Sequence, residues 1–290
     1  MDKKNIHIAI IGQGYVGTAF KELVKDYYNI VTYDPAFDEV YPHEDISKCQ
    51  LAVVCVPTPM ADDGKCDTSI VEAAIERLNN PHILLKSTIS PGTTDRLRQK
   101  TGKNITFSPE YIGESTYFNP VHQTMKETPF LIIGGPTEEI EYLFNIFEPI
   151  MGPYAHYFKC SAVEAEVIKY MENSFLATKV TFVNEFYEIA KTFGADWHAV
   201  REGWLLDERM GRAFSSVFAE KRGFGGKCLP KDVNGIVSAS EKRGYSPELL
   251  KQVLKSNEFF QGKSSKTVPK PQEALKPVSK HPQLTSILSN

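Results

Sequence analysis

Three glycines between an apolar strand and an amphipathic helix constrain the fold of this chain more than any other feature. Residues 5–11 (NIHIAII) have the pattern of a short buried strand, and Gly12-x-Gly14-x-x-Gly17 follows at once. YVGTAFKELVKDYY (15–28) then predicts an amphipathic helix, and IVTYD predicts a second strand that ends at Asp34. Strand, glycine turn, helix and strand in this order predict the first βαβ unit of a doubly wound fold.

Each glycine has a separate mechanical role in such a turn. Gly12 would make the tight turn, Gly14 would let a pyrophosphate approach the backbone, and Gly17 would allow the helix to pack closely on the strand. The phosphates would then face the backbone N–H groups at the helix start, at Tyr15 and Val16. We therefore expect a dinucleotide site; a glycine turn of purely structural meaning is the alternative.

The acid at the end of the second strand indicates which dinucleotide. Asp34 follows Gly12 at the spacing, about 20 residues, from which a carboxylate can accept hydrogen bonds from a ribose diol. The same carboxylate would repel a 2′-phosphate, so the sequence favours NAD over NADP.

Strand and helix patterns keep alternating to about residue 160 and predict an N-terminal domain (1–160) built on a parallel, doubly wound sheet. Ligands of such sheets bind beyond the carboxyl ends of the strands. Three polar stretches fall there: Pro57-Thr58-Pro59, Ser87-Thr88 and Ser108-Pro109-Glu110. Each taken alone could equally be an ordinary loop.

From Ser161 to Gly194 the pattern is continuously helical, and shorter helical segments follow. They predict an all-α central domain (161–261) that the long helix connects to the sheet. Lys169 and Asn173 are four residues apart and share a helix face, although this pairing is common by chance. Residues 262–290 are rich in proline and lysine without periodicity and predict a flexible tail.

Composition excludes several classes of function. A net charge of −3 gives no electrostatic reason to bind nucleic acid or an anionic membrane, and no apolar run approaches the roughly 20 residues that span a bilayer. The start does not resemble a signal peptide. The five cysteines form no CxxC, and no histidine pair has metal-ligand spacing. We expect a cytoplasmic protein without disulfides or a metal site.

The segment GFGGKCLPKD (223–232) raises a separate question. Cys228 follows three glycines and precedes Lys231 and Asp232. From these residues alone it is either a reactive thiol on a tight loop or a small apolar residue.

The chain resembles the UDP-glucose/GDP-mannose dehydrogenase family from about residue 6 to about residue 260. The matching segments, in order, are IAIIGQGYVG, VCVPTPMADDGKCD, KSTISPGTT, SPEYIGES, EAEVIKYMENSFLATKVTFVNE, DERMG and GFGGKCLPKD. The resemblance implies NAD-dependent, four-electron oxidation of the C6 alcohol of a sugar nucleotide, with UDP-glucose to UDP-glucuronate as the first choice. It also implies that Cys228 is the nucleophile, through a thiohemiacetal and a thioester.

Further roles follow from the same resemblance. It implies catalytic roles for Cys228, Lys169, Asn173, Asp232, Glu110 and Thr88. It extends the cofactor site of Gly12, Gly14, Tyr15, Val16, Gly17 and Asp34 to Pro57, Thr58, Thr88 and Glu114. It implies substrate contacts from Glu110, Tyr111, Lys169, Asn173, Arg209, Phe224 and Gly225. Arg209 would reach the sugar bound to a neighbouring subunit, which implies a homodimer; the role of Lys231 is open.

The chain departs from the family at its C-terminal end. Members continue into a second Rossmann-like domain that helps hold the nucleotide, whereas only the segment 262–290 follows the central helices here. A natural short form, a chain cut before that domain and a half-enzyme completed by another polypeptide are all compatible with this. Two alternatives to the four-electron enzyme therefore stay open: a non-catalytic subunit that binds NAD or a sugar nucleotide, and a two-electron dehydrogenase of the β-hydroxyacid type, which needs no thiol.

Overall fold

A computed structural model describes residues 6–113 and 124–262 of the 290. The strands are β1 (His7–Ile11), β2 (Asn29–Tyr33), β3 (Leu51–Val54), β4 (His82–Leu85), β5 (Ile105–Phe107), β6 (Phe130–Gly134) and β7 (His156–Cys160). The α-helices are α1 (Tyr15–Val24), α2 (His43–Ser47), α3 (Ser69–Arg77), α4 (Thr93–Thr101), α5 (Thr137–Met151), α6 (Ala162–Thr192), α7 (Trp197–Trp204), α8 (Leu229–Glu241) and α9 (Glu248–Phe260). The short 3₁₀ helices include η2 (Met125–Glu127) and η3 (Glu208–Met210). The tail expected to be flexible lies almost wholly outside the described residues.

The sheet has seven strands in the order β2-β1-β3-β4-β5-β6-β7. Strands β1 to β5 are parallel, and the chain changes direction across the sheet between β1 and β3. Such a switch point leaves a crevice beyond the carboxyl ends of the two strands, where ligands of doubly wound sheets bind. Gly12 follows β1 and Pro57-Thr58 follow β3, so both segments border this crevice.

One part of the expected parallel sheet is different. β6 pairs antiparallel with β5 through Phe107 and Gly134, and β7 runs parallel to β6. Parallel neighbours need a crossover, usually a helix, whereas the described parts of the β5–β6 connection contain only η2. The sheet is therefore mostly parallel with one reversed pair at its edge.

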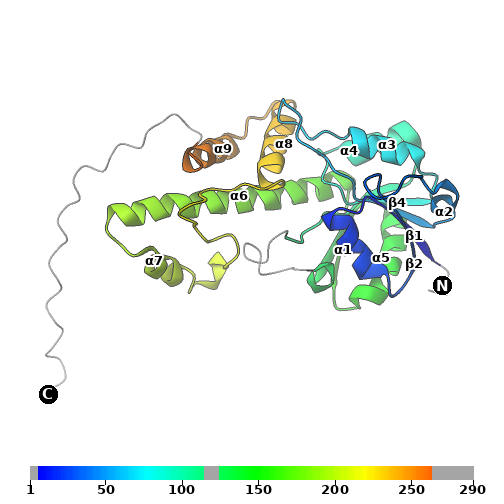
Figure 1. The fold of residues 1–290 in the computed structure, drawn as a ribbon, viewed down its shortest axis with the longest axis horizontal. Helices are drawn as coiled ribbons and strands as arrows, with labels where there is room; N and C mark the ends of the chain where they lie inside the picture. Colours follow the sequence, from blue (N-terminus) through cyan, green and yellow to red (C-terminus); the bar gives the residue numbers. More distant parts are fainter. Residues whose placement is uncertain (1–5, 114–123, 263–290) are drawn as a thin grey trace, which may run out of the picture.

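Alternation along the strands builds a core on each face of the sheet. Ile8 and Ile10 of β1 pack on the side of α1 and α5, and Ala9 and Ile11 pack on the side of α3 and α4. Figure 1 shows these two helical layers below and above the sheet. The central strands β1, β3, β4 and β5 are thus buried on both faces, as is usual in parallel sheets, whereas the edge strands β2 and β7 are partly exposed.

Helix α6 connects the sheet to the helical half. Its start is fixed by a capping box, in which Glu164 N donates to Ser161 Oγ and Ser161 N donates to Glu164 Oε2. At β6 it packs so closely that a Cβ on Gly134 would lie 2.5 Å from Ser161 O. The predicted start at Ser161 is confirmed, and the 31-residue helix is about 46 Å long.

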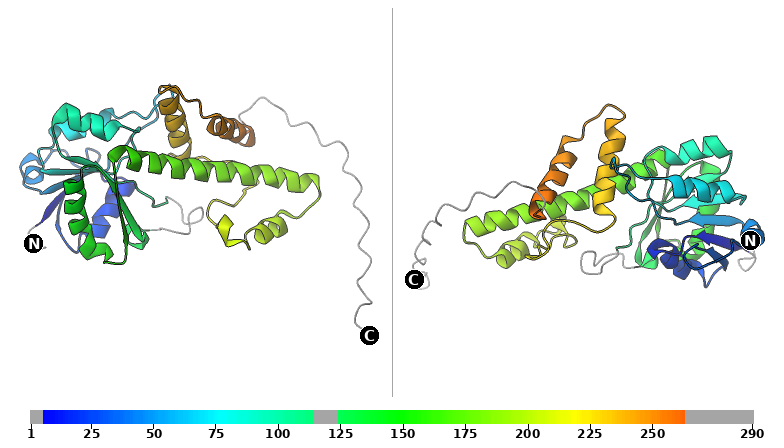
Figure 2. Two further views of the ribbon diagram at one scale, coloured as in Figure 1. Left: turned by 180° about the vertical axis from the view of Figure 1, so that it is seen from behind. Right: turned by 45° about the horizontal axis from the view of Figure 1, so that its top comes forward.

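Beyond the sheet, α8 and α9 pack on one side of α6 and α7 on another, as both views of Figure 2 show. A small third core lies between α6, α8 and α9. It is formed by Ala177 and Val180 of α6, Val233 of α8, Val253 of α9 and Phe224 of the loop before α8. This core holds the loop that carries Cys228 against the long helix.

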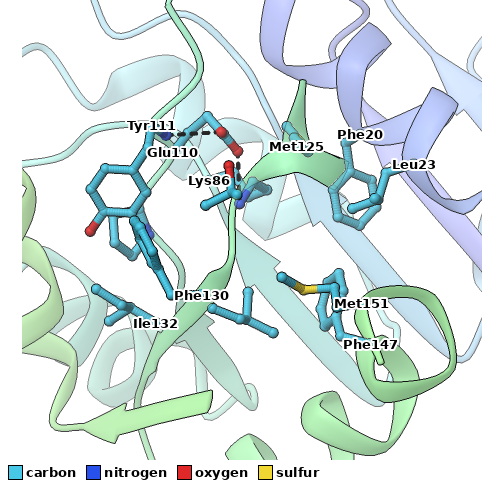
Figure 3. A pocket seen from close by; sticks show the side chains of 13 residues that line it. Phe20, Leu23, Lys86, Glu110, Tyr111, Met125, Phe130, Ile132, Phe147 and Met151 are labelled. Carbon is cyan, nitrogen blue, oxygen red and sulfur yellow. Dashed lines mark hydrogen bonds and ion pairs between the residues drawn. The ribbon is translucent and has the colours of Figure 1, made fainter. Parts of the chain in front are cut away.

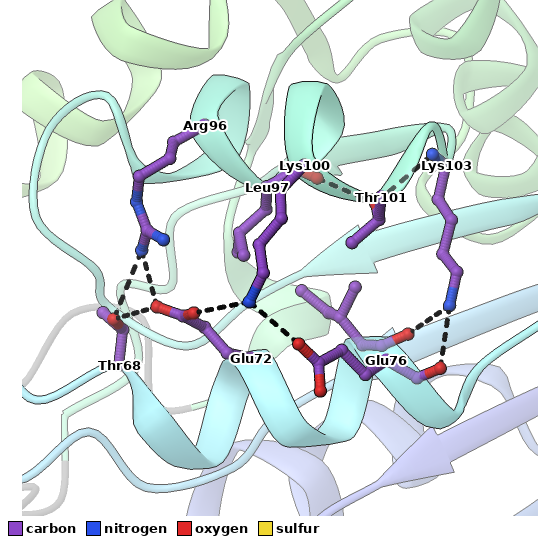
Figure 4. Close-up of polar contacts among 9 residues, drawn as sticks. Thr68, Glu72, Glu76, Arg96, Leu97, Lys100, Thr101 and Lys103 are labelled. Atoms are coloured by element: carbon purple, nitrogen blue, oxygen red, sulfur yellow. Dashed lines mark hydrogen bonds and ion pairs between the residues drawn. The ribbon is translucent and has the colours of Figure 1, made fainter.

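Charged groups join α3 and α4 on the outside of the sheet (Figure 4). Arg96 Nη2 lies 2.7 Å from Glu72 Oε1, and Lys100 Nζ lies 2.8 Å from Glu76 Oε1. The hydrogen bond from Arg96 is the main reason that the pKa of Glu72 is lowered to about 2. Solvent-exposed pairs of this kind contribute little each, about 0–1 kcal/mol. Within the described ranges, no helix has the length and apolar composition needed to cross a membrane.

Candidate functional site

The glycine turn leaves space for a ligand beside the start of α1. Gly12 has φ +93°, and a Cβ there would lie 2.6 Å from Cys55 O. A Cβ on Gly17 would lie 1.9 Å from Gly12 O, so only glycine lets α1 approach this closely. Around Gly14, by contrast, no described atom lies within 4 Å of a Cβ position. The N–H groups of the first turn of α1 face this opening, which suits a pyrophosphate.

Asp34 borders the same turn. Its Oδ2 accepts a hydrogen bond from Gln13 N at 2.6 Å, and its Oδ1 accepts one from Ala36 N at 2.9 Å. Each carboxylate oxygen keeps a further lone pair for a ribose hydroxyl. The cradle and the acid together fit NAD, with the pyrophosphate at the turn and a ribose at Asp34. Tyr15, from the first turn of α1, is about half exposed and donates to Gly113 O at 2.5 Å.

The polar residues after β3 and β4 lie at the same edge. Pro57 is exposed, Thr58 is buried, and Thr88 is half-buried. The Cys66 thiol donates to Thr88 O at 3.3 Å and lies close enough to Lys231 and Asp232 to sense their charges. The strand ends thus meet the start of α8, far away in sequence.

A chain of buried polar groups links α6 to α8. Lys169 Nζ donates to Asn173 Oδ1 at 3.2 Å, and Asn173 Nδ2 donates to Asp232 Oδ2 at 2.5 Å. Lys231 Nζ lies 2.6 Å from the other oxygen, Asp232 Oδ1. Asp232 is 1% exposed, so its charge is compensated by an amide donor and an ammonium group inside the protein. The structure therefore brings together four of the residues singled out in the sequence.

Cys228 lies at the start of α8, the helix that carries Asp232. It is the N-cap residue of α8, its carbonyl accepts from Asp232 N at 2.9 Å, and its side chain is exposed. The partial positive charge of a helix N-terminus favours negative charge at this position. The other thiols differ, since burial raises the pKa of Cys66, raises those of Cys49 and Cys160 to about 11 and raises that of Cys55 to about 12. Of the five cysteines, Cys228 is the one with an exposed side chain, and it lies at the start of a helix.

The loop before Cys228 is held by a residue that the sequence did not single out. Asn257 of α9 uses both ends of its amide, because Oδ1 accepts from Phe224 N at 2.6 Å and Nδ2 donates to Phe224 O at 2.9 Å. Gln261 Nε2 donates to the same Phe224 carbonyl at 2.6 Å. Phe224 is buried and Gly225 is exposed. No short motif marks Asn257, because its partner lies in a separate segment of the chain, on the other side of α8.

Glu110 is held differently from the other catalytic candidates. Its Oε2 lies 3.2 Å from Lys86 Nζ, and its Oε1 accepts from Tyr111 N and Ile112 N at 2.8 and 3.1 Å. Figure 3 shows this pair on the wall of a small cavity of about 30 Å³, which is otherwise lined mainly by apolar side chains such as Phe20. The cavity has room for water but not for a nucleotide. Lys86, the partner of Glu110, was not identified from the sequence.

Tyr111 connects this pair to the α6 network. Its ring centroid lies 5.2 Å from Lys169 Nζ, a cation–π distance, and burial raises the pKa of its hydroxyl. Glu172, also missed from the sequence, lies on the same part of α6. Burial raises the pKa of Glu172, Lys169 opposes that shift, and Glu110 adds to it. Glu110, Tyr111, Lys169 and Glu172 therefore form one electrostatic cluster beside Asn173.

Arg209 was predicted to contact substrate, but it lies away from this cluster. Arg209, in η3, is exposed and paired with Asp207 at 2.5 Å. Lys179 donates to Met210 O and Gly211 O, both at 2.8 Å, so η3 lies beside residue 179, about 15 Å along α6 from Lys169. Glu114 lies outside the described residues.

Comparison with known proteins agrees with this geometry. Residues 36–151 match the NAD binding domain of the UDP-glucose/GDP-mannose dehydrogenase family, and residues 163–259 match its central domain. UDP-glucose 6-dehydrogenase AglM of Haloferax volcanii is 29% identical over 87% of this chain and 70% of its own length. UDP-glucose 6-dehydrogenase TuaD of Bacillus subtilis is 28% identical over 87% of this chain and 62% of its own length.

A solved structure is similar to this chain over the same part. The UDP-glucose dehydrogenase of the hyperthermophilic archaeon Pyrobaculum islandicum superposes with a TM-score of 0.74 at 26% identity, over 89% of this chain and 69% of that one. The chain thus spans about two thirds of the length of these relatives, and the matched part contains the NAD-binding half and the central helices. With its glycine cradle, its mostly parallel sheet and its long helix α6, the chain belongs to the UDP-glucose/GDP-mannose dehydrogenase family, and its cofactor is NAD.

Proposed function

We propose that this protein catalyses the NAD-dependent, four-electron oxidation of the C6 alcohol of a sugar nucleotide to a carboxylate, with UDP-glucose as the substrate to test first. One observation carries the proposal: the exposed Cys228 shares the first turn of α8 with Asp232, whose carboxylate is bonded to Asn173 of α6. Cys228 thus lies one helical turn from the carboxylate that binds Asn173, and Asn173 in turn accepts from Lys169, an ammonium group that can stabilise an oxygen anion.

The cofactor site and the reaction site would share the crevice at the strand ends. The glycine turn and Asp34 would hold NAD, with Pro57, Thr58 and Thr88 along the same edge. When bound, NAD supplies the hydride acceptor. The remaining chemistry belongs to the side chains of this chain.

In the first oxidation, Lys169 and Asn173 would stabilise the C6 oxygen as it loses its proton, and the carbon loses a hydride to become an aldehyde. The Cys228 thiolate would then form a C–S bond to the aldehyde carbon, which gives a thiohemiacetal with its oxygen on the same pair. Loss of a second hydride from that carbon gives a thioester. Water adds to the thioester carbonyl, the C–S bond breaks, and the thiolate is restored.

The balanced reaction gives the ratio of NADH to carboxylate that an assay should find. One alcohol, two NAD and one water give one carboxylate, two NADH and three protons. Asp232 is buried and both of its oxygens are bonded, so we assign it to positioning Asn173 and Lys231 rather than to contact with water. Thr88, half-buried at the strand edge, is the better candidate to hold the water. Glu110, whose Oε2 lies 3.2 Å from Lys86 Nζ, is the acid/base candidate.

A substrate panel with NADH detection tests the proposal. The wild-type chain should give two NADH for each UDP-glucuronate formed from UDP-glucose, and GDP-mannose and N-acetylated UDP-sugars test the sugar and the base. Cys228→Ser should lower acid formation on the order of 10³-fold or more while NAD still binds. Cys160→Ser is the matched control, since burial raises the pKa of that thiol.

Three outcomes would contradict the proposal. Acid formation at the normal rate by Cys228→Ser would exclude the thioester route. NAD binding without turnover on any sugar nucleotide would favour a non-catalytic binding subunit, and one NADH per product would favour a two-electron enzyme.

We also propose that the protein is a homodimer formed along α6. Apolar side chains at four-residue steps are exposed on that helix: Val167 at 44%, Met171 at 74% and Phe175 at 65%. Soluble monomers seldom expose such a continuous stripe, and a second copy of α6 would cover it. The exposed Arg209 could then reach the partner's site. Phe175→Glu should give monomers in sedimentation analysis, whereas Lys191→Glu, an exposed charge change on the opposite face of the same helix, should not; dimers in both would exclude this interface.

Two coarser assignments complete the proposal. We divide the chain into an NAD-binding domain (1–160) and a helical central domain (161–261), because the contacts within each half build separate cores. We place the protein in the cytoplasm, where its five cysteines would stay reduced.

A further inference from the structure

A small basic cavity lies along α8, toward the end of the helix that is away from Cys228. It has a volume of about 170 Å³ and is bordered by Lys65 of the loop after β3, Ser90 of the loop after β4, and Gly235, Lys242 and Arg243 of α8 and its C-terminal end. The sheet half and the helical half thus each supply part of the wall. None of these five residues belongs to the proposed catalytic or NAD-binding sets.

The cavity concentrates positive charge. Lys65 and Lys242 are so close that Lys242 contributes, after burial, to lowering the pKa of Lys65. Lys65 pairs with Asp63, whereas the ion pairs of the described residues include neither Lys242 nor Arg243. Of these three cations, Lys65 alone has an ion-pair partner among the described residues. The negative end of α8 favours Lys242 and Arg243 at its C-terminus, but it does not account for Lys65, which approaches from another segment.

Size and donors indicate the class of ligand. Pockets for drug-sized molecules are usually about 300–1,000 Å³, so this one suits a small group. A guanidinium group, two ammonium groups and a hydroxyl are hydrogen-bond donors that match a tetrahedral oxyanion. An anion there would also relieve the repulsion between Lys65 and Lys242.

We propose that this cavity binds a phosphate group, either as free inorganic phosphate or as the phosphate of a small organic ester. Binding would join the loops after β3 and β4 to α8. Ser90 is two residues after Thr88, and Gly235 is one turn after Asp232, so the bound anion would fix two segments that carry residues of the proposed active site. A Cβ on Gly235 would lie 3.4 Å from the ring of Tyr170, next to Lys169, so this part of α8 borders α6 close to the proposed active site.

Thermal unfolding and calorimetric titration with inorganic phosphate test the proposal on the whole chain. NAD is present throughout, so that it occupies the start of α1 and phosphate binding there is not measured. Sodium chloride at equal ionic strength is the reference, because it screens charges to the same extent. Wild type should show saturable binding and a higher Tm in phosphate than in chloride. Lys242→Ala should bind about tenfold more weakly, which corresponds to the loss of one charge-assisted hydrogen bond.

The control is Lys255→Ala, which removes an exposed charge from α9 outside the cavity and should bind as wild type does. Ribose 5-phosphate distinguishes the two sources, because a site for free phosphate rejects it and a site for an ester binds it with the same dependence on Lys242. Equal Tm in phosphate and chloride, or equal affinity in wild type and Lys242→Ala, overturns the proposal. These measurements need neither turnover nor a sugar nucleotide, so they do not depend on the proposed enzyme activity.

Discussion

Replacing Asn257 with alanine tests how the cysteine loop is held. In the native protein the Asn257 amide bonds both the N–H and the carbonyl of Phe224, at 2.6 and 2.9 Å. Both residues are buried, so water does not replace a lost partner easily. After the substitution the Phe224 carbonyl keeps its bond from Gln261 Nε2, but the Phe224 N–H loses its acceptor.

The expected loss of stability follows from this difference between the Phe224 N–H and the Phe224 carbonyl. A buried donor without a partner costs about 1–3 kcal/mol, whereas a carbonyl that loses one of two bonds costs less. We expect Asn257→Ala to lower the free energy of unfolding by about 2 kcal/mol in denaturant titrations. Gln261→Ala, the matched control, removes only the second bond to the carbonyl and should cost less than about 1 kcal/mol.

Position as well as stability should change, because Cys228 is only four residues beyond Phe224. In Asn257→Ala the rate of reaction of the Cys228 thiol with a small disulfide reagent should change, and kcat for acid formation should fall with the KM for NAD unchanged. Equal losses of stability in Asn257→Ala and Gln261→Ala, or no loss in either, would refute the role of Asn257 in holding the loop.

Three further changes probe the cofactor turn and the base of α6. Asp34→Ala should weaken NAD binding about tenfold in a fluorescence titration, because a charged acceptor for the ribose is lost; unchanged affinity would show that Asp34 does not bind the ribose. Gly17→Ala should lower Tm and abolish NAD binding, since its Cβ would lie 1.9 Å from Gly12 O, and a native-like Tm would contradict this packing. Burial raises the pKa of Glu166, so its carboxyl contributes most to stability below its unfolded pKa of about 4.3 and loses that contribution as pH rises through the folded value. Unfolding of Glu166→Gln across pH should show the wild type losing stability relative to the variant as pH rises, and parallel curves would count against it.

Local backbone demands explain why much of the fold could be predicted. The glycine turn, the strand that ends at Asp34 and the capped start of α6 at Ser161 each depend on residues within one short segment. The reversed β6 could not be predicted in this way, because β5 has only three residues and strand direction depends on the connection. Helix α2 was also missed, since Ile46 is its only buried residue.

The candidate site shows the same division. Cys228, Asn173 and Asp232 lie in short motifs, so the sequence alone could single them out as candidates. Their support could not, because Lys86 reads as the end of an apolar strand and Asn257 as one polar residue of an amphipathic helix. Lys86 and Asn257 contact their partners only because the fold brings distant segments together, and a local sequence pattern does not predict such contacts.

Helix α6 is long, and side-chain hydrogen bonds attach its N-terminal part to the sheet half. At its base the Glu166 carboxylate accepts from Gly92 N at 2.5 Å, Thr94 N at 2.9 Å and Thr94 Oγ1 at 2.6 Å, which clamps it to the first turn of α4. Phe193, at the other end, lies about 40 Å away along the helix axis. A tilt of about 5° at the clamp would therefore swing that tip by about 3–4 Å, while Lys169, less than one turn from the clamp, would hardly move.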